Sequence, residues 1–531
     1  MKSALQNEAS SREAAPTKRH SERRSRSQTT LAALVFGAGI GSLATEIAAS
    51  RLLAPYFGSS TIVWANLIGI VLAALALGYF LGGKLADRRP EPRLLGLIVL
   101  AAAAWVALTP FIARPFLDAT VSSLDDASAG AVVGSFFAVL LLFSPAVVLL
   151  GMVSPFAIRL AITDVATAGA VAGRFYALST VGSLLGTFVP ALIAIPLIGT
   201  QRTLLGTAFV LAASASLLLG RRAAVAAVAF AVLVAIPPGA VKAGEGLLYE
   251  EESRHQFIQV LERDDGRRLL SLNEGVAVHS VWREETVLTG GIWDALLTVP
   301  VVLERPPRRV AILGNAGGTL ARAFGVFWPR TAIDGVEIDA AVTKVGYRFF
   351  GLADNPRVTT YDEDARPFLR RLDRRYDVIY VDAYHQPYVP FYLATRDFFE
   401  LVRDRLAPGG AVVLNVATVP DDDALVREVS GTLATVFPEV RVWNALRFNR
   451  VVIGFSAPGG SSYGSLEPPD SRLSPLVSLL ERDLRSRPAV TPASDPWTDD
   501  HAPVEWVTDR MIVSFAARGG DLDEAPLPTA P

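Results

Sequence analysis

The chain has 531 residues, of which 51% are hydrophobic, with a mean hydropathy of +0.36 and a formal net charge of −2. This composition excludes an ordinary, wholly soluble protein, and the near-neutral charge gives no electrostatic reason to expect a nucleic-acid partner. The absence of cysteine excludes disulfides and thiolate chemistry, and the five histidines show no metal-ligand spacing, so we expect no metal.

The first half has the composition of a membrane domain. Residues 1–30 are polar and basic and predict a disordered tail. Residues 31–240 hold long apolar stretches, and a spanning helix needs about 20 such residues, so we expect a multi-pass domain with six or seven helices. The candidate spans are 31–50, 62–83, 94–113, 130–151, 175–198, 203–219 and 223–238.

Basic residues indicate which loops face the cytoplasm. They gather in the tail, in the loops 84–93 and 159–174, and at Arg221-Arg222, which the positive-inside rule assigns to one side. Seven spans would leave the second half outside the cytoplasm, whereas six would leave it inside. Because nucleotide-type cofactors are cytoplasmic, we expect a protein of the cell membrane with a cytoplasmic soluble domain.

A small β-rich subdomain is expected at residues 247–300. Short β-prone stretches at 257–261, 268–272 and 276–281 are separated by turn residues, which is typical of antiparallel strands. A helix is expected over 290–303.

Residues 301–515 alternate between strands and helices. This alternation predicts a Rossmann-like, methyltransferase-type α/β domain with a mainly parallel sheet. The expected strands are 310–313, 331–338, 357–361, 376–382 and 411–415, and the expected helices are 319–327, 340–350, 366–372 and 396–406. The proline- and acid-rich residues 519–531 predict a disordered tail.

Polar residues cluster where these strands end. Asn315, Glu337, Asp364 and Asp382 lie at or near the carboxyl ends of four strands, and ligands of such sheets bind at that edge. Glu337 follows the glycine turn 314–317 by about 20 residues, the spacing at which an acid usually grips a ribose. The alternative is that Glu337 is an ordinary solvated acid at a strand end.

At these residues the chain resembles the spermidine synthase family, in its membrane-bound branch, over roughly residues 248–455. In the soluble half the resemblance rests on the segments 335–339, 364–366, 376–382 and 408–410, and in the membrane half on 46–58, 77–88 and 151–155. It implies an aminopropyltransferase that moves an aminopropyl group from decarboxylated S-adenosylmethionine to a polyamine such as putrescine. No metal is implied, the bilayer is a further partner, and a homodimer is a candidate assembly.

The resemblance also implies residue roles. Asp382 would orient and deprotonate the attacking amine. The implied cofactor-binding residues are Gly314, Asn315, Gly317, Glu337, Asp364 and Ala365, and the implied substrate-binding residues are Asp294, Tyr384, His385 and Tyr388.

Three departures from the family pattern keep other functions open. The glycine turn 313–318 lacks the family's acid, His385 stands where a second carboxylate is expected, and 292–294 reads Ile-Trp-Asp instead of Tyr-His-Glu. The cofactor acids are therefore better preserved than the amine-binding acids. The alternatives are a methyltransferase-like enzyme that uses S-adenosylmethionine, and a non-catalytic transporter or sensor that binds a polyamine or nucleoside.

Overall fold

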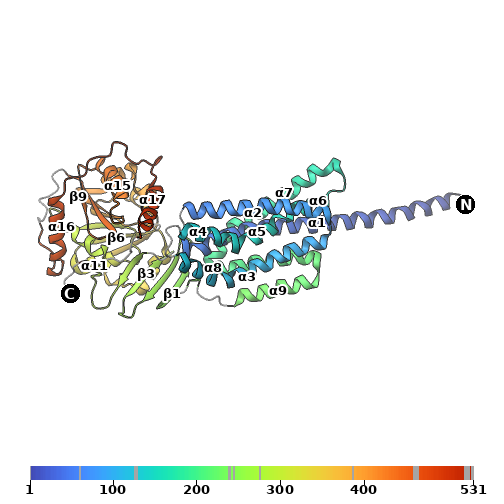
Figure 1. The fold of residues 1–531 in the computed structure, drawn as a ribbon, viewed down its shortest axis with the longest axis horizontal. Coiled ribbons are helices and arrows are strands. Elements are labelled where there is room, and N and C mark those ends of the chain that lie inside the picture. Colours follow the sequence, from blue (N-terminus) through green and yellow to red (C-terminus); the bar gives the residue numbers. More distant parts are fainter. Residues whose placement is uncertain are drawn as a thin grey trace. The chain divides into compact units, whose positions relative to one another are not determined.

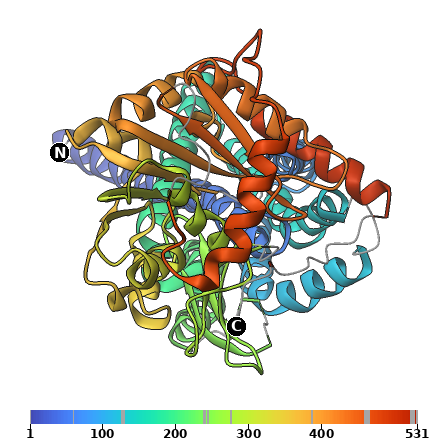
Figure 2. The same ribbon diagram turned by 90° about the vertical axis from the view of Figure 1, so that its left-hand side faces the viewer.

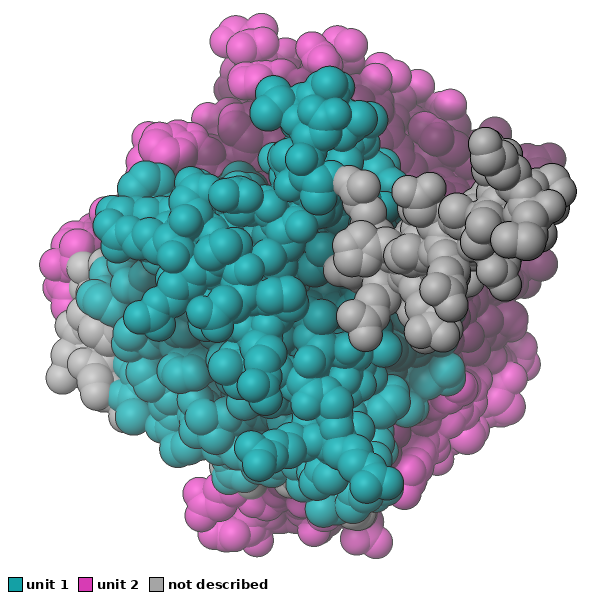
Figure 3. All heavy atoms as spheres, turned by 90° about the vertical axis from the view of Figure 1, so that its right-hand side faces the viewer, with its two compact units in different colours: residues 1–124, 130–242 teal, residues 125–129, 243–531 magenta. Residues whose placement is uncertain are grey.

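The computed structural model divides the chain into two compact units. Unit 1 comprises residues 1–124 and 130–242, and unit 2 comprises 125–129 and 243–531 (Figure 3). The structure describes residues 2–58, 61–124, 130–236, 241–242, 245–273, 277–384, 388–457, 466–519 and 527, with most of their side chains from residue 28 onward. Most of the predicted tail 519–531, and His385, lie outside the described residues.

Unit 1 is helical throughout its described part (Figure 1). Its α-helices are α1 (Lys2–Phe57), α2 (Thr61–Arg88), α3 (Pro92–Leu124), α4 (Gly130–Ala138), α5 (Ser144–Gly151), α6 (Val153–Ala161), α7 (Ala168–Val189), α8 (Ile195–Leu219) and α9 (Arg221–Ala235). The structure differs from the predicted disordered tail, because α1 begins at Lys2. Fourteen of residues 1–30 are alanine, glutamate, lysine or arginine, which favour helix.

Five helical runs in the described residues are long and apolar enough to cross a membrane. They are Gln28–Phe57, Val63–Arg88, Pro92–Thr120, Val133–Ala161 and Val165–Leu219. The last run has 55 residues, or about 80 Å of helix, against a bilayer core of about 30 Å. It contains two of the spans predicted from the sequence, and α9 corresponds to the seventh.

Helix α7 lies against α1 through glycines. A side chain on Gly182 would clash with the carbonyl oxygen of Phe36, and one on Gly186 with that of Ile40. From the first contact to the second, the position moves four residues forward on both helices, so α1 and α7 run parallel. Such small residues allow close helix–helix approach.

Helix α8 also lies against α1, but in the opposite direction. A side chain on Gly37 would contact Ser214, whereas one on Gly41 would clash with Leu211. The chain therefore reverses between these parts of α7 and α8, and Gly199, inside α8, has a φ of +79° at a kink. Glycine adopts this left-handed conformation at little cost. The fifth apolar run consequently makes two passes.

The chain leaves unit 1 at the C-terminal end of α1. The Tyr56 hydroxyl donates to the carbonyl oxygen of Val241 at 2.9 Å, and Lys242 Nζ donates to that of Pro55 at 2.7 Å. Helix α9 starts where α8 ends, toward the other end of α1, so α9 also traverses the unit. In the described residues the chain thus makes seven passes, counting α4 to α6 as one.

Helix α2 makes a close backbone contact through two of its glycines. A side chain on Gly78 would clash with the backbone of Val148, and one on Gly82 with that of Met152. A methyl group on Gly83 would meet nothing within 4 Å, so this glycine makes no such contact.

Unit 2 begins with a four-stranded antiparallel sheet. Its strands, in spatial order, are β1 (Leu247–Glu252), β2 (Phe257–Glu262), β3 (Arg268–Leu272) and β4 (Val278–Trp282). The sequence predicts the last three and misses β1, because its run of three glutamates lacks an apolar alternation. Helix α10 (Ile292–Thr298) follows.

The remainder of unit 2 is an α/β domain with a seven-stranded sheet of order β10-β11-β9-β8-β5-β6-β7 (Figure 2). The strands are β5 (Arg309–Leu313), β6 (Ala332–Glu337), β7 (Val358–Asp362), β8 (Tyr376–Val381), β9 (Leu406–Ala417), β10 (Glu439–Trp443) and β11 (Asn449–Phe455). The helices are α11 (Thr319–Phe327), α12 (Ala340–Phe349), α13 (Ala365–Arg371), α14 (Arg396–Arg405), α15 (Ala424–Ala434), α16 (Ser474–Ser486) and α17 (Val504–Ala517). Strands β5 to β9 are parallel to one another, and β11 is antiparallel to both of its neighbours, β9 and β10. The predicted Rossmann-like class is confirmed.

The register of the sheet fixes the position of the candidate site. Leu313, the last residue of β5, pairs with Val336 of β6 and Val381 of β8. Gly314 after β5, Asp382 after β8 and Glu337 at the end of β6 therefore lie at one edge of the sheet. All six residues of β8 are buried, as expected for a central strand covered on both faces.

Candidate functional site

A pocket opens at the carboxyl edge of the parallel strands in unit 2, where ligands of such sheets bind. Both the α/β domain and the small antiparallel sheet contribute to it. Its lining residues are His255, Gln256, Leu272, His279, Gly314, Ala316, Val336, Glu337, Ile338, Glu363, Asp364, Ala365, Asp382, Ala383, Tyr384, Pro390, Tyr392 and Leu393.

The glycine turn after β5 forms one wall of the pocket. Gly314 has φ +89°, and a side chain there would clash with the backbone of Asp382, so the position requires glycine. Gly317 donates its N–H to Ser280 Oγ at 2.9 Å, which ties the turn to β4. Gly317 and the buried Asn315 stand beside the pocket and do not line it.

Glu337, at the end of β6, is buried and faces the pocket. Its Oε2 accepts the N–H of Ala316 at 3.0 Å, and its Oε1 accepts that of Asp339 at 3.1 Å. Burial raises the pKa of this carboxyl to about 7, although the backbone donors oppose the shift. These two backbone hydrogen bonds hold the Glu337 carboxylate in one orientation.

Asp364 has a structural contact on each oxygen. Its Oδ1 accepts the N–H of Arg366 at 2.8 Å and caps α13, and its Oδ2 accepts the Tyr392 hydroxyl at 2.7 Å. Ala365 follows and is also part of the lining. Asp364 and Ala365 therefore form part of the pocket wall, and both carboxylate oxygens of Asp364 already accept hydrogen bonds from the protein.

Asp382 follows β8 and is half-buried in the lining. Its Oδ1 accepts the side-chain N–H of Asn415 at 2.8 Å. Burial raises the pKa of Asp382 to about 7, against the lowering effect of the Asn415 and Trp293 side chains. A carboxylate with a pKa near neutrality suits general-base work at physiological pH.

Two of the three tyrosines near Asp382 reach the pocket. Tyr384 and Tyr392 line it, and the Tyr384 hydroxyl donates to the carbonyl oxygen of Asn415 at 2.8 Å. Tyr388, predicted to bind substrate, is buried outside the lining and donates its hydroxyl to Asp509 of α17 at 2.5 Å.

Asp294 is also placed outside the pocket lining. Its carboxylate accepts the backbone N–H groups of Thr289 and Gly290 at 2.8–3.0 Å, and the Thr289 hydroxyl at 3.0 Å. These bonds fix the turn before α10 and leave the buried carboxylate with a structural role. The structure therefore does not support the substrate-binding role that the resemblance implied for Asp294.

The small antiparallel sheet contributes residues that sequence reasoning missed. His255 and Gln256 come from the turn between β1 and β2, and that turn is anchored because Ser253 Oγ donates to Asp339 Oδ2 at 2.5 Å. Glu363 also lines the pocket. No local pattern marks His255 and Gln256, because only the packing of the small sheet on α12 brings them to the pocket.

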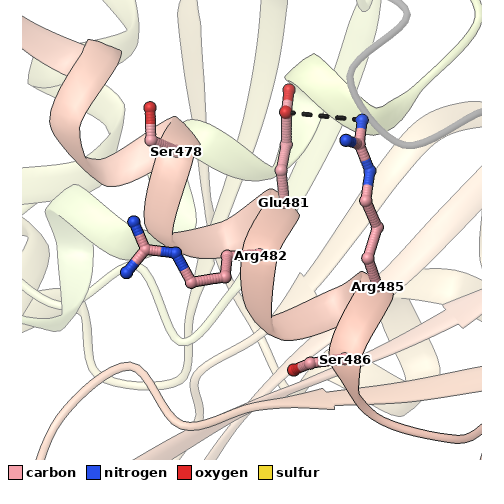
Figure 4. Close-up of a pocket in the computed structure, with 5 residues that line it drawn as sticks. All are labelled: Ser478, Glu481, Arg482, Arg485 and Ser486. Carbon is pink, nitrogen blue, oxygen red and sulfur yellow. Dashed lines mark ion pairs between the residues drawn. The ribbon is translucent and has the colours of Figure 1, made fainter.

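A second hollow lies on α16. Its lining residues are Ser478, Glu481, Arg482, Arg485 and Ser486 (Figure 4). All five come from one helix, and Glu481 pairs with Arg485 at 3.6 Å. Because none of them belongs to the sheet edge, we regard the pocket at that edge as the candidate site. Within the described residues, no group of three or more acids, histidines or cysteines could hold a metal ion.

The fold of this domain is Rossmann-like and of the methyltransferase type. Residues 293–446 match the sequence family described as the spermine/spermidine synthase domain. The chain is 34% identical over 278 residues to the probable polyamine aminopropyl transferase of Bifidobacterium longum, covering 49% of this chain and 61% of that protein. It is 28% identical over 199 residues to the polyamine aminopropyltransferase of Vibrio vulnificus, covering 36% and 66%.

The chain thus matches somewhat less than two thirds of the length of these relatives. A solved structure of a probable spermidine synthase from Corynebacterium glutamicum aligns with a TM-score of 0.36 at 20% identity, covering 54% of this chain and all of that one. Residues 293–446 of unit 2 are thus similar to the spermine/spermidine synthase domain.

Proposed function

We propose that unit 2 is a polyamine aminopropyltransferase that uses decarboxylated S-adenosylmethionine as donor and a polyamine such as putrescine as acceptor. One observation carries this proposal. Glu337 and Asp382, the acids expected to bind the ribose and to activate the amine, line one pocket beside the glycine turn. The family of the domain and the names of its relatives support the same reaction class.

In the proposed reaction, the acceptor nitrogen attacks the aminopropyl carbon bonded to the sulfonium. A nitrogen–carbon bond forms, the carbon–sulfur bond breaks with its electron pair going to sulfur, and methylthioadenosine leaves. The nitrogen then carries an extra proton, and we propose that Asp382 accepts it. Such proton transfer typically contributes about 10²–10⁴-fold to the rate.

The acceptor is a dication, and its binding needs carboxylates or aromatic faces. Because Asp294 is held in its own turn, we assign this role to Glu363 and to the rings of Tyr384 and Tyr392, which line the pocket. Glu363 also forms an ion pair with Arg371. The site therefore presents less unpaired negative charge to an amine than the family pattern implies.

The direct test is methylthioadenosine formation by the purified full chain with decarboxylated S-adenosylmethionine and putrescine. Asp382→Asn should lower turnover by about 10²–10⁴-fold while nucleoside binding persists. The matched control is Asp500→Asn, an exposed aspartate outside the lining, which should leave turnover unchanged. If the wild type forms no methylthioadenosine with any diamine or polyamine, the transferase proposal is wrong.

For unit 1 we propose a multi-pass anchor in the cell membrane. The five apolar runs support this, as do large apolar side chains that stand exposed on the helices, such as Leu72, Phe80, Phe111 and Leu197. A surface of this kind on a soluble monomer would be unusual, and a bilayer would cover it. The homodimer stays a prediction.

The side of the membrane on which unit 2 lies bears on its chemistry. The pass count supports the seven-span alternative, in which the basic tail and the linker at Val241 lie on opposite sides. The pair Asp87–Arg159 places two basic loops at one end of unit 1, the end that the positive-inside rule assigns to the cytoplasm. We therefore propose, against the cytoplasmic placement expected from cofactor supply, that unit 2 faces outward.

A reporter fused after Arg518 tests this topology. Alkaline phosphatase, which is active outside the cytoplasm, should be active at this position, and a fluorescent protein that folds only in the cytoplasm should be dark. Activity of the opposite reporter would restore the six-span arrangement.

An outward-facing unit 2 gives specific support to a second function. The donor nucleoside would have to reach the outer face, and the altered acceptor motif at 382–385 already weakens the case for catalysis. The second candidate is a non-catalytic polyamine or nucleoside sensor or transporter. Calorimetry with decarboxylated and intact S-adenosylmethionine separates the candidates: preference for the intact form indicates a methyltransferase-like site, and polyamine binding without turnover indicates a sensor.

A further inference from the structure

Two asparagines connect Asp382 to the strands beyond it. Asn415 lies on β9 and donates from Nδ2 to Asp382 Oδ1 at 2.8 Å. Asn449, the first residue of β11, donates from Nδ2 to Asn415 Oδ1 at 2.8 Å. Strands β8, β9 and β11 are adjacent in the sheet, so the two bonds cross three strand ends in one line.

We propose that Asn449 and Asn415 form a positioning relay that holds the Asp382 carboxylate in the orientation needed to accept a proton from the bound amine. The relay's part in catalysis rests on the proposed aminopropyl transfer. Neither asparagine belongs to the pocket lining, so both act through Asp382.

The orientation of the Asn415 side chain matters because one end of its amide donates hydrogen bonds and the other end accepts them. Asn415 can present either its donor or its acceptor to Asp382, and the acceptor would repel a carboxylate. Because Asn449 donates to Asn415 Oδ1, the amide of Asn415 is turned with its donor toward Asp382. Asn415 is buried, where an amide with the wrong end forward would be costly.

Other contacts hold the relay in place. The Tyr384 hydroxyl donates to the carbonyl oxygen of Asn415 at 2.8 Å and accepts the N–H of Ala417 at 2.9 Å, which fixes the end of β9. The Asp382 carboxylate is thus held by a donor on β9 whose own strand end is fixed.

The relay also favours the charged form of Asp382, because hydrogen bonds to a carboxylate stabilise its ionised state. Loss of one such bond is expected to raise the pKa of Asp382 by about one to two pH units. The other titratable groups that share the pocket are His255, His279, Glu337, Glu363, Asp364, Tyr384 and Tyr392. The relay residues do not titrate, so a shift that follows their replacement reports on the bond itself.

The test replaces Asn449 by leucine in the full-length protein, which removes the donor at similar volume. The acid limb of the turnover profile should move up by about one pH unit, with turnover at pH 7 reduced about fivefold and KM for the donor unchanged. Asn444→Leu is the matched control, since Asn444 is exposed in the turn before β11. Asn449→Gln, which restores an amide donor, should recover part of the loss.

A second measurement does not depend on turnover. Infrared titration of protein with isotope-labelled aspartate, compared with Asp382→Asn, follows Asp382 directly, and Asn449→Leu should raise its midpoint. A raised midpoint in a protein without transferase activity would support the relay and refute the proposed function. An active enzyme whose profile and midpoint are both unmoved would overturn the relay. If Asn449→Leu does not fold, the nearly isosteric Asn415→Asp must raise the midpoint, and no change there would overturn it equally.

Discussion

Glu337 offers the sharpest test of the candidate site. In the proposed complex its carboxylate accepts hydrogen bonds from the two ribose hydroxyls of the nucleoside. Replacing it by alanine removes a charged acceptor, and such a bond is worth about 1.5–3 kcal/mol. Glu337→Ala should therefore weaken the binding of methylthioadenosine roughly ten- to a hundredfold.

The same residue predicts a pH dependence. The pKa of Glu337 is raised to about 7, so its protonated form prevails below that pH and its carboxylate above it. The carboxylate is the better acceptor, so affinity should rise about tenfold from pH 6 to pH 8 and then level off. Asp382 has a pKa of about 7 as well, so the titration is measured in the Asp382→Asn background.

Isothermal titration calorimetry on the full chain provides the measurement. Glu337→Gln keeps the shape of the side chain without its charge and should abolish the pH dependence. Glu284→Gln, an exposed glutamate outside the lining, is the control and should bind as the wild type does. An affinity that is unchanged in a folded Glu337→Ala variant would remove this residue from the nucleoside site and refute the reasoning.

Two further predictions concern backbone approach. Gly314→Ala should lower the thermal midpoint of unit 2 and disturb the pocket, because its methyl group would clash with the backbone of Asp382 at a left-handed φ. A midpoint equal to that of wild type would contradict the geometry of the turn. Gly182→Leu should destabilise unit 1 in detergent by several degrees, since the side chain would clash with Phe36, whereas Gly83→Leu should be neutral, because nothing lies within 4 Å; equal losses in the two variants would show that α1 and α7 do not pack closely.

The sequence by itself determined the elements of unit 2 that depend on local pattern. Strand β8 is fully buried and reads as a continuous β-prone run, and α11 begins and ends where the pattern predicts. Glu337 and Asp382 could be placed together because the carboxyl ends of parallel strands meet at one edge. In unit 1, apolar length located the candidate spans.

Tertiary structure decided what these residues contact. Asp294 and Tyr388 carry the right chemistry for an amine site, yet Asp294 is saturated by its own turn and Tyr388 binds α17. His255 and Gln256 enter the pocket only because the small sheet packs on the α/β domain. Hydrogen-bond partners far apart in the chain are not encoded in any local spacing.

Apolar length located seven candidate spans in unit 1, but it left open whether six or seven helices cross. The reversal between α7 and α8 becomes visible only through the opposite directions in which the two helices pack against α1. Local sequence fixes where a helix forms, because its hydrogen bonds are local, whereas its direction is fixed by the side chains it meets across the bundle.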